Sequence, residues 1–220
     1  MLKPIYLLSP TPRAESISMP MITFKTKADS LNLNSCDTLM FTSKQAVVTA
    51  NSIDEEWKKY PCLAIGSATK KQIESFGAKV IYSPKEYYGE SLSKDIAEFF
   101  RDKKILYLRP KEISFDSKGF LKKEAIELQE QIIYETSCIS YLDDNKPKKD
   151  AIIIFTSPST IHCFLKNFKW DNSYIAIVIG ESTKVHLPKN ANFFVADEPT
   201  IDACLKKSKD IYYSLTPSRL

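Results

Sequence analysis

Apolar and polar positions along the chain form blocks of two kinds. A run rich in β-branched residues at 151–155 (Ala-Ile-Ile-Ile-Phe) is followed by a stretch in which apolar residues recur at helical spacing, such as Ile161 and Phe164. The first block is typical of a strand buried on both faces, and the second of an amphipathic helix. Ser157 and Pro158, between them, suit an N-cap and a first helical position. This stretch therefore predicts a buried parallel strand, a tight turn and a helix.

The same succession occurs earlier in the chain. Residues 41–43 (Phe-Thr-Ser) match residues 155–157, and each copy is followed by a second apolar strand that ends in a glycine, Gly66 or Gly180. The spacing from the phenylalanine to the glycine is 66 − 41 = 25 residues in one copy and 180 − 155 = 25 in the other. Three matched features at a constant offset, in a chain with 5 Gly, indicate two related α/β halves. The alternative is two ordinary strand–helix units that look alike.

Strand and helix blocks alternate along the whole chain, which predicts an α/β fold with parallel, doubly wound sheets. The second half supplies three strands, which is thin for a domain, and residues 4–26 are available to complete its sheet. Residues 10–16 are too short and too rich in proline for a crossover helix. We expect strands at 4–9, 21–26, 37–42, 62–66, 79–83, 104–109, 131–136, 151–156, 175–180 and 192–196. We expect helices at 43–51, 67–76, 90–101, 158–168 and 200–209, a mostly helical stretch at 115–128, and a short helix after Glu181.

Composition narrows the class of protein. A chain of 220 residues forms one large domain or two of about 110, and the duplication favours two. A net charge of +4 fits an anionic small ligand, and because no dense Lys/Arg block is present we expect no nucleic-acid partner. No apolar run approaches the 18 or so residues of a membrane span, and the apolar start is too short for a signal peptide. We therefore expect a cytoplasmic, non-membrane protein and, without a further apolar stripe, a monomer.

The cysteines are 5 in number, scattered, and contain no C-x-x-C pair. This pattern predicts reduced thiols in a cytosolic setting. Cys62, Cys138 and Cys163 lie within or beside apolar runs and are expected in the core.

Hydroxyl residues and glycines gather where predicted strands pass into helices. Ligands of open α/β sheets bind beyond the carboxyl ends of strands, where helix N-termini offer free amides and the positive end of a dipole. Each residue taken alone is explained as a simple helix cap, whereas the recurrence in both halves favours anion binding. The candidate residues are Thr42, Ser43, Gly66, Thr69, Ser157, Ser159, Gly180 and Thr183.

Other motifs give less information about function. Neither G-x-x-x-x-G-K-S/T nor G-x-G-x-x-G occurs, so nucleotide binding has no direct support. The two histidines, His162 and His186, are far apart and suggest no metal site. Arg109, at the end of an apolar strand, could hold a ligand carboxylate in its planar fork or form a salt bridge to a helix start. Tyr134 lies near another strand end, where a half-buried structural tyrosine is the default interpretation.

Taken together, these segments resemble the uroporphyrinogen-III synthase family. The segments that carry the resemblance, in the family's order, are 41–47, 65–69, 105–109, 133–136, 155–159 and 179–183. The resemblance implies two similar parallel-sheet α/β lobes, flavodoxin-like and HemD-like, joined by two extended linkers near 20–25 and 135–141. One lobe would be discontinuous, residues 1–22 plus 138–220, and the other would span 25–135. The chain departs from the family in its shortened first crossover, 10–19, and at 110–114, where a Gly-rich, Arg-bearing turn is usual.

The resemblance also implies an activity. The family closes the linear tetrapyrrole hydroxymethylbilane with loss of water and inversion of the terminal pyrrole, giving uroporphyrinogen III, and no cofactor or metal is implied. Spontaneous closure gives the uninverted isomer, so the enzyme would act by holding one geometry of a polycarboxylate substrate. Tyr134 corresponds by motif to the family's noted tyrosine and would donate a proton to the departing hydroxyl. The eight candidate residues above and Arg109 would contact substrate, the hydroxyl residues largely through backbone amides.

Two other functions fit the pattern less well. One is a non-catalytic, two-lobed binding protein for an anionic metabolite. Such proteins are often exported, and the lack of a signal peptide counts against that version. The other is a flavodoxin-like regulatory module, which would need a phosphorylatable Asp at a strand end. The strand ends here carry Thr and Ser instead.

Overall fold

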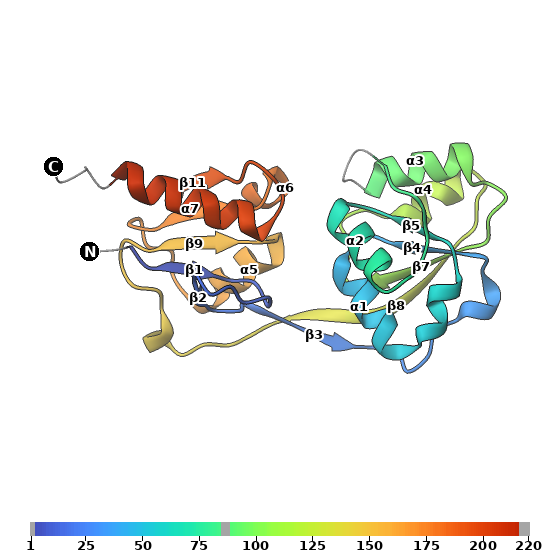
Figure 1. Cartoon of the computed structure of the whole chain (residues 1–220), viewed down its shortest axis with the longest axis horizontal. Coiled ribbons are helices and arrows are strands. Elements are labelled where there is room, and N and C mark those ends of the chain that lie inside the picture. Colours follow the sequence, from blue (N-terminus) through green and yellow to red (C-terminus); the bar gives the residue numbers. More distant parts are fainter. Residues whose placement is uncertain (1–2, 85–88, 216–220) are drawn as a thin grey trace. The chain divides into compact units, whose positions relative to one another are not determined.

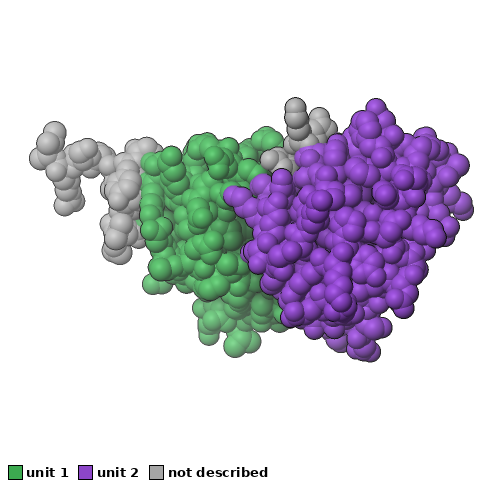
Figure 2. All heavy atoms as spheres, turned by 45° about the vertical axis from the view of Figure 1, so that its right-hand side comes forward, with its two compact units in different colours: residues 1–23, 137–220 green, residues 24–136 purple. Residues whose placement is uncertain are grey.

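The computed structural model describes residues 3–84 and 89–215 and divides into two compact units (Figures 1 and 2). Unit 1 comprises residues 1–23 and 137–220, and unit 2 comprises residues 24–136. The outermost residues of the predicted discontinuous lobe, 1–2 and 216–220, lie outside the described residues. Each unit contains a sheet of parallel strands with helices, to which β3 (Ile22–Thr26) adds an antiparallel edge in unit 2, so the predicted α/β class is confirmed.

Unit 2 is built on a six-stranded sheet in the order β3-β8-β7-β4-β5-β6. Its strands are β3 (Ile22–Thr26), β4 (Thr38–Phe41), β5 (Cys62–Ala64), β6 (Val80–Tyr82), β7 (Ile105–Pro110) and β8 (Leu128–Cys138). Its helices are α1 (Lys44–Ile53), α2 (Ser67–Ser75), α3 (Gly89–Phe99) and α4 (Ser117–Lys123), with 3-10 turns at Leu33–Ser35 and Glu55–Lys59. β3 and β8 are also the two strands through which the chain passes between the units.

The central strands of the sheet in unit 2, β4, β5 and most of β7, are buried on both faces, as continuous apolar strands require. On one face α1 and α2 pack with Phe41, Trp57 and Tyr134. On the other face α3 and α4 pack with Met40 and Tyr107 (Figure 1). In β4, β5 and β7 neighbouring residues therefore belong to different cores, whereas Ile133 and Tyr134 of β8 belong to the same one, where the register with β7 shifts.

Unit 1 has a five-stranded sheet in the order β11-β10-β9-β1-β2. Its strands are β1 (Ile5–Leu7), β2 (Ile17–Ser18), β9 (Ile152–Phe155), β10 (Ile175–Val178) and β11 (Asn192–Val195). Its helices are α5 (Pro158–Asn167), α6 (Glu181–Lys184) and α7 (Ile201–Leu215), with a 3-10 turn at Asp143–Asn145. β1 pairs in parallel with β9, Ile5 opposite Ile152, so the prediction that the N-terminal segment completes the thin sheet is confirmed. No helix forms between β1 and β2.

The internal repeat is visible in the strand register. In unit 2 the Ile65 N–H donates to the Phe41 carbonyl at 3.0 Å, and in unit 1 the Ile179 N–H donates to the Phe155 carbonyl at 3.0 Å. Phe41 pairs with Ala64, as Phe155 pairs with Val178. In each copy the two strand–helix turns lie side by side at the carboxyl edge of their sheet. The predicted relation between the halves is therefore confirmed.

The boundary between α4 and β8 differs from the prediction of a mostly helical stretch over 115–128. α4 ends at Lys123, because Ala125 adopts a left-handed conformation with φ of 56°. The Ala125 and Ile126 amides then bond back to the carbonyls of Lys122 and Leu121, at 3.1 and 2.9 Å. This is the pattern of a Schellman cap, which normally uses glycine. β8 begins at Leu128 and continues to Cys138, beyond both ends of the predicted strand.

The prediction of reduced cysteines is wrong for one pair. Cys138, the last residue of β8, and Cys163, on α5, form a disulfide with Cα atoms 5.2 Å apart. The longer β8 brings Cys138 onto α5, which the expected strand end at residue 136 did not allow. Cys36, Cys62 and Cys204 are free thiols. Burial raises the pKa of Cys62 and Cys204 to about 12, so these two core thiols stay protonated.

Two helix caps of the same geometry carry different residues, which allows a paired stability prediction. α2 ends with Gly77 at φ of 85° in the same bonding pattern in which α4 ends with Ala125. We expect Gly77→Ala to lower the free energy of unfolding by about 1 kcal/mol and Ala125→Gly to raise it by a similar amount. A Cβ at Gly77 would meet no atom within 4 Å, so the cost is one of backbone conformation. Urea unfolding of both variants measures the effect, and shifts of equal sign would contradict it.

No helix within the described ranges is long and apolar enough to cross a membrane. In the same residues, no three His, Cys, Asp or Glu side chains gather into a group that could hold a metal ion.

Candidate functional site

The turn from β4 to α1 holds two of the predicted residues, Thr42 and Ser43. Ser43 is the N-cap of α1, and its Oγ accepts the Ala46 N–H at 3.1 Å. The same Oγ lies 2.9 Å from the hydroxyl of Tyr134. The Thr42 Oγ1 lies 2.6 Å from the hydroxyl of Tyr107. The structure thus brings three predicted polar groups together and adds Tyr107, which the sequence analysis did not single out.

Tyr134 is a protonated phenol that can act as a hydrogen-bond donor. Its side chain is 4% exposed, and burial raises its pKa, an effect that the hydrogen bond with Ser43 partly offsets. Because the Ser43 Oγ already accepts an amide proton, the serine can donate its own proton to the phenol oxygen. When a ligand is bound beyond the strand end, that arrangement frees the phenol proton of Tyr134 for it; without a ligand, the buried phenol can donate to the second lone pair of the Ser43 Oγ.

Arg109 has partners within the protein. Its Nη1 donates to the carbonyls of Pro110 and Lys111 at 2.9 and 3.1 Å. Its Nε lies 3.3 Å from the Glu130 Oε1, an ion pair without hydrogen-bond geometry, and both side chains are mostly buried. The salt-bridge alternative thus finds a partner on the neighbouring strand and not at a helix start. The guanidinium thus links the carboxyl end of β7 to Glu130, near the start of β8, and Arg109 lies on the face of β7 that Tyr107 shares.

The turn from β5 to α2 is open to an anion. Gly66 is the N-cap, at φ of 84° and ψ of 145°, and no side chain caps the first amides of α2. The Lys70 N–H bonds to the Gly66 carbonyl at 3.0 Å, so the helix proper starts at Ser67. Thr69 is 4% exposed as a whole residue, so its side chain is buried against the protein. Ser67 is exposed.

At the equivalent turns of unit 1, side chains of the protein itself cap the helix start or place a charge there. Ser157 caps α5 by accepting the Thr160 N–H at 3.3 Å, in a reciprocal capping box, while Ser159 is exposed. After β10, Gly180 is extended, and the first helical residue is Glu181, whose carboxylate lies 2.9 Å from the Lys184 Nζ. The Thr183 side chain is buried, and its amide bonds to the Gly180 carbonyl at 3.0 Å. α6 therefore carries a negative charge where α2 has none.

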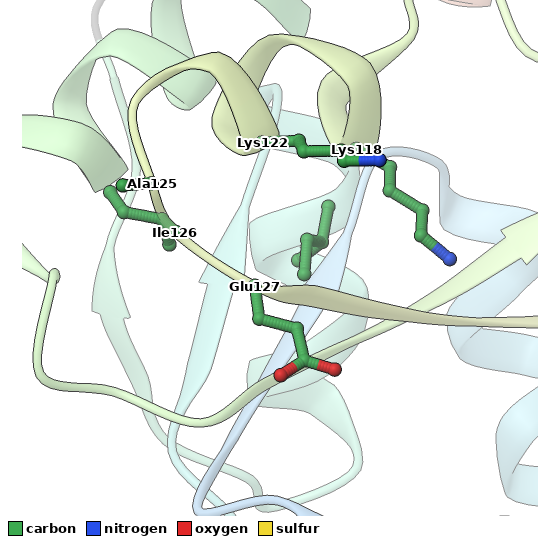
Figure 3. Close-up of a pocket in the computed structure, with 6 residues that line it drawn as sticks. Lys118, Lys122, Ala125, Ile126 and Glu127 are labelled. Atoms are coloured by element: carbon green, nitrogen blue, oxygen red, sulfur yellow. The ribbon is translucent and has the colours of Figure 1, made fainter.

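Two hollows in unit 2 lie away from these turns. One, of about 390 Å³, lies beneath α4, with side chains from Lys118 and Lys122 on that helix and Glu127 just before β8 (Figure 3). The other, of about 350 Å³, includes Arg101 and Lys104. The first lies at the amino end of β8 and the second at the amino ends of β7 and β8, the opposite edge of the sheet, and neither contains a predicted site residue.

A comparison with models of known families identifies one family. A family model described as uroporphyrinogen-III synthase HemD matches residues 13–206 of the chain. No curated protein sequence gives a significant match. Among solved structures, a uroporphyrinogen-III synthetase from Helicobacter pylori is similar, with 24% identity and a TM-score of 0.79 over 96% of this chain and all of that one. A mutant uroporphyrinogen III synthase from Thermus thermophilus gives 11% identity and a TM-score of 0.63 over 97% of this chain and all of that one. At these identities, the two structures support the fold.

Proposed function

The chain belongs to the uroporphyrinogen-III synthase family, and on that premise we propose that it cyclises hydroxymethylbilane to uroporphyrinogen III at the carboxyl edges of its sheets. It is a cyclising lyase of tetrapyrrole (haem) biosynthesis. The observation that supports the placement is the recurrence, in both units, of paired strand–helix turns at a carboxyl edge, where helix starts favour anions.

The residues fit a polycarboxylate substrate through positioning. Charge-assisted hydrogen bonds contribute about 1.5–3 kcal/mol each, so a few carboxylates bound at these turns suffice to hold one conformer. We propose contacts with Thr42, Ser43 and the open start of α2 (Gly66 and the amide of Thr69) as the main ones. In unit 1 we propose Ser157 and Ser159, with Gly180 and Thr183 contributing less because Glu181 repels an anion. We also propose a substrate contact for Arg109, whose guanidinium is held in place by its partners within the protein.

The chemical step requires only a modest catalytic contribution from side chains of the protein. Closure replaces the terminal carbon–oxygen bond with a carbon–carbon bond and releases one water, and the inversion breaks one further carbon–carbon bond of the terminal pyrrole and forms another. The pyrrole carbon loses a proton on closure, which restores the acid. The oxidation state does not change overall, so the reaction needs no redox cofactor. A pyrrole nitrogen expels the terminal hydroxyl, and Tyr134 is proposed to supply the proton that leaves with it as water. A phenol with a raised pKa is a weak acid at neutral pH, so its contribution is modest and substrate geometry carries most of the selectivity.

The remaining features of the proposal concern the whole chain. We propose that residues 1–22 plus 138–220 and residues 25–135 act as two domains joined by extended linkers near 20–25 and 135–141. We further propose a cytoplasmic monomer without nucleic-acid or membrane partners. Hydroxymethylbilane is the proposed small-molecule partner.

The test of the function is the isomer formed. Purified protein is given fresh hydroxymethylbilane, the products are oxidised, and the uroporphyrin isomers are separated by chromatography. An excess of isomer III over a protein-free control is expected. Isomer I alone, from a folded and monodisperse sample, would overturn the proposal and favour a two-lobed binding protein for an anionic metabolite.

We expect Tyr134→Phe to lower kcat about tenfold, less than the usual 10²–10⁴ of a general acid, with isomer III still the main product. The reason is that the pyrrole nitrogen already drives departure of the hydroxyl, and the lost group is a weak acid. Steady-state kinetics measure this, with unfolding of the variant as the check on its fold. Unchanged turnover would remove Tyr134 from the mechanism.

A further inference from the structure

The β4–α1 turn is held from both faces of the sheet. Thr42 and Ser43 are consecutive, and each hydroxyl contacts a buried tyrosine from a different core. Tyr134 packs in the core beneath α1 and α2, and Tyr107 packs in the core beneath α3 and α4. The two phenols therefore fix the two hydroxyls of one short turn in different directions.

The direction of the Thr42–Tyr107 hydrogen bond follows from burial. Tyr107 is 3% exposed, and within the described residues the structure gives its hydroxyl Thr42 as partner, at 2.6 Å. Burial raises the pKa of Tyr107 to about 12, so the phenol keeps its proton at any working pH. A buried donor left unpaired costs free energy, so the phenol donates to the Thr42 Oγ1. The Thr42 proton is then free to point outward from a side chain that is partly exposed.

We propose that Tyr107 is a positioning residue of the cyclisation reaction, which orients the Thr42 hydroxyl as a donor to a carboxylate of the substrate. This inference rests on the proposed function. Tyr107 does not touch substrate: it acts through Thr42, and its effect is on binding.

Another buried tyrosine provides the contrast. Tyr174, in unit 1, is 1% exposed and donates to the Pro147 carbonyl at 2.6 Å. Its bond is as short and as buried as that of Tyr107, but a carbonyl has no proton to pass to a ligand. Tyr174 is thus a matched control for the structural cost of losing a buried phenol hydroxyl.

The experiment combines Tyr107→Phe with a double-mutant cycle. We expect Tyr107→Phe to raise the KM for hydroxymethylbilane about tenfold, the loss of roughly one oriented hydrogen bond, and to change kcat less than threefold. Thr42→Val should raise KM similarly, and adding Tyr107→Phe to it should have little further effect. Thr42→Ser, which keeps the hydroxyl, should retain most of the binding.

The controls separate the possible failures. Tyr174→Phe should lower stability about as much as Tyr107→Phe and leave KM unchanged. A wild-type protein that forms no isomer III would overturn the proposed function. An active wild type with an unchanged KM in Tyr107→Phe, additive effects of Tyr107→Phe and Thr42→Val, or an equal KM rise in Tyr174→Phe would each overturn the positioning role alone.

Discussion

Replacing Gly66 with alanine is expected to lower the free energy of unfolding by about 2 kcal/mol and kcat/KM by more than tenfold. At φ of 84° and ψ of 145° the backbone of Gly66 occupies a region open almost only to glycine. An alanine there either bears the strain or shifts the start of α2, whose open amides are the strongest candidate for binding a substrate carboxylate. Stability and activity should therefore fall together.

Gly180→Ala is the matched control, because Gly180 is the same position of the other repeat. Its φ of −178° is extended backbone that any residue adopts, and an added Cβ would meet no atom within 4 Å. We expect a change of less than about 0.5 kcal/mol, typical of a surface substitution, and nearly unchanged kinetics. Denaturant unfolding and steady-state assays of both variants give the comparison. Equal losses of stability and of kcat/KM in the two variants would show that the backbone conformation of Gly66 is not the cause of the effect.

The two glycines also show how much of the local structure could be predicted from the sequence. Gly66 and Gly180 end matching strands, and periodicity and cap residues predicted both helix starts because those signals are local. Their different backbone conformations depend on how each turn packs, which no local pattern records. The end of α4 was missed for a related reason, since Ala125 takes a left-handed conformation for which the sequence signal is normally glycine.

The candidate site was predicted in part. Strand ends and hydroxyl residues singled out Thr42, Ser43 and Tyr134 one by one, and the structure shows that Ser43 and Tyr134 are in contact. Tyr107 was missed, since its apolar neighbours made the strand look like plain core, and Glu130 was missed because the predicted strand began at residue 131. Alternation alone places Tyr107 and Arg109 on one face of β7, and that was the available signal. The Cys138–Cys163 pair depends on packing between distant segments and had no such signal.

The two halves share a plan but differ in charge at their helix starts. α1 and α5 each have a serine cap, whereas α2 and α6 start after glycine. α6 begins with Glu181 and spans four residues, while α2 begins with Ser67 and spans nine. A negative group at a helix start neutralises the positive end of the helix dipole, so an anionic ligand is attracted less strongly there. Anion binding is therefore expected to be concentrated in unit 2.

That asymmetry gives the second large prediction, Ser67→Asp, which makes the start of α2 resemble that of α6. A carboxylate in the first turn of a helix stabilises it by about 0.3–1 kcal/mol. The same carboxylate interacts with the uncapped amides at the start of α2 and repels a substrate carboxylate. We therefore expect the KM for hydroxymethylbilane to rise at least tenfold, while the free energy of unfolding is unchanged or higher. Few substitutions weaken binding and strengthen the fold together, so the combination identifies a ligand site.

Ser75→Asp is the control, an identical change at the last residue of α2, about 12 Å along the helix at 1.5 Å per residue. There the charge opposes the helix dipole and the Ser75 bond to the Gln72 carbonyl is lost, so stability should fall by about 0.5–1 kcal/mol while KM stays unchanged. Thermal unfolding and the isomer-resolved assay measure both quantities. Because net charge changes equally in the two variants, a KM rise in both would indicate long-range repulsion by the whole protein. A rise in Ser67→Asp alone would place the bound carboxylate at the start of α2.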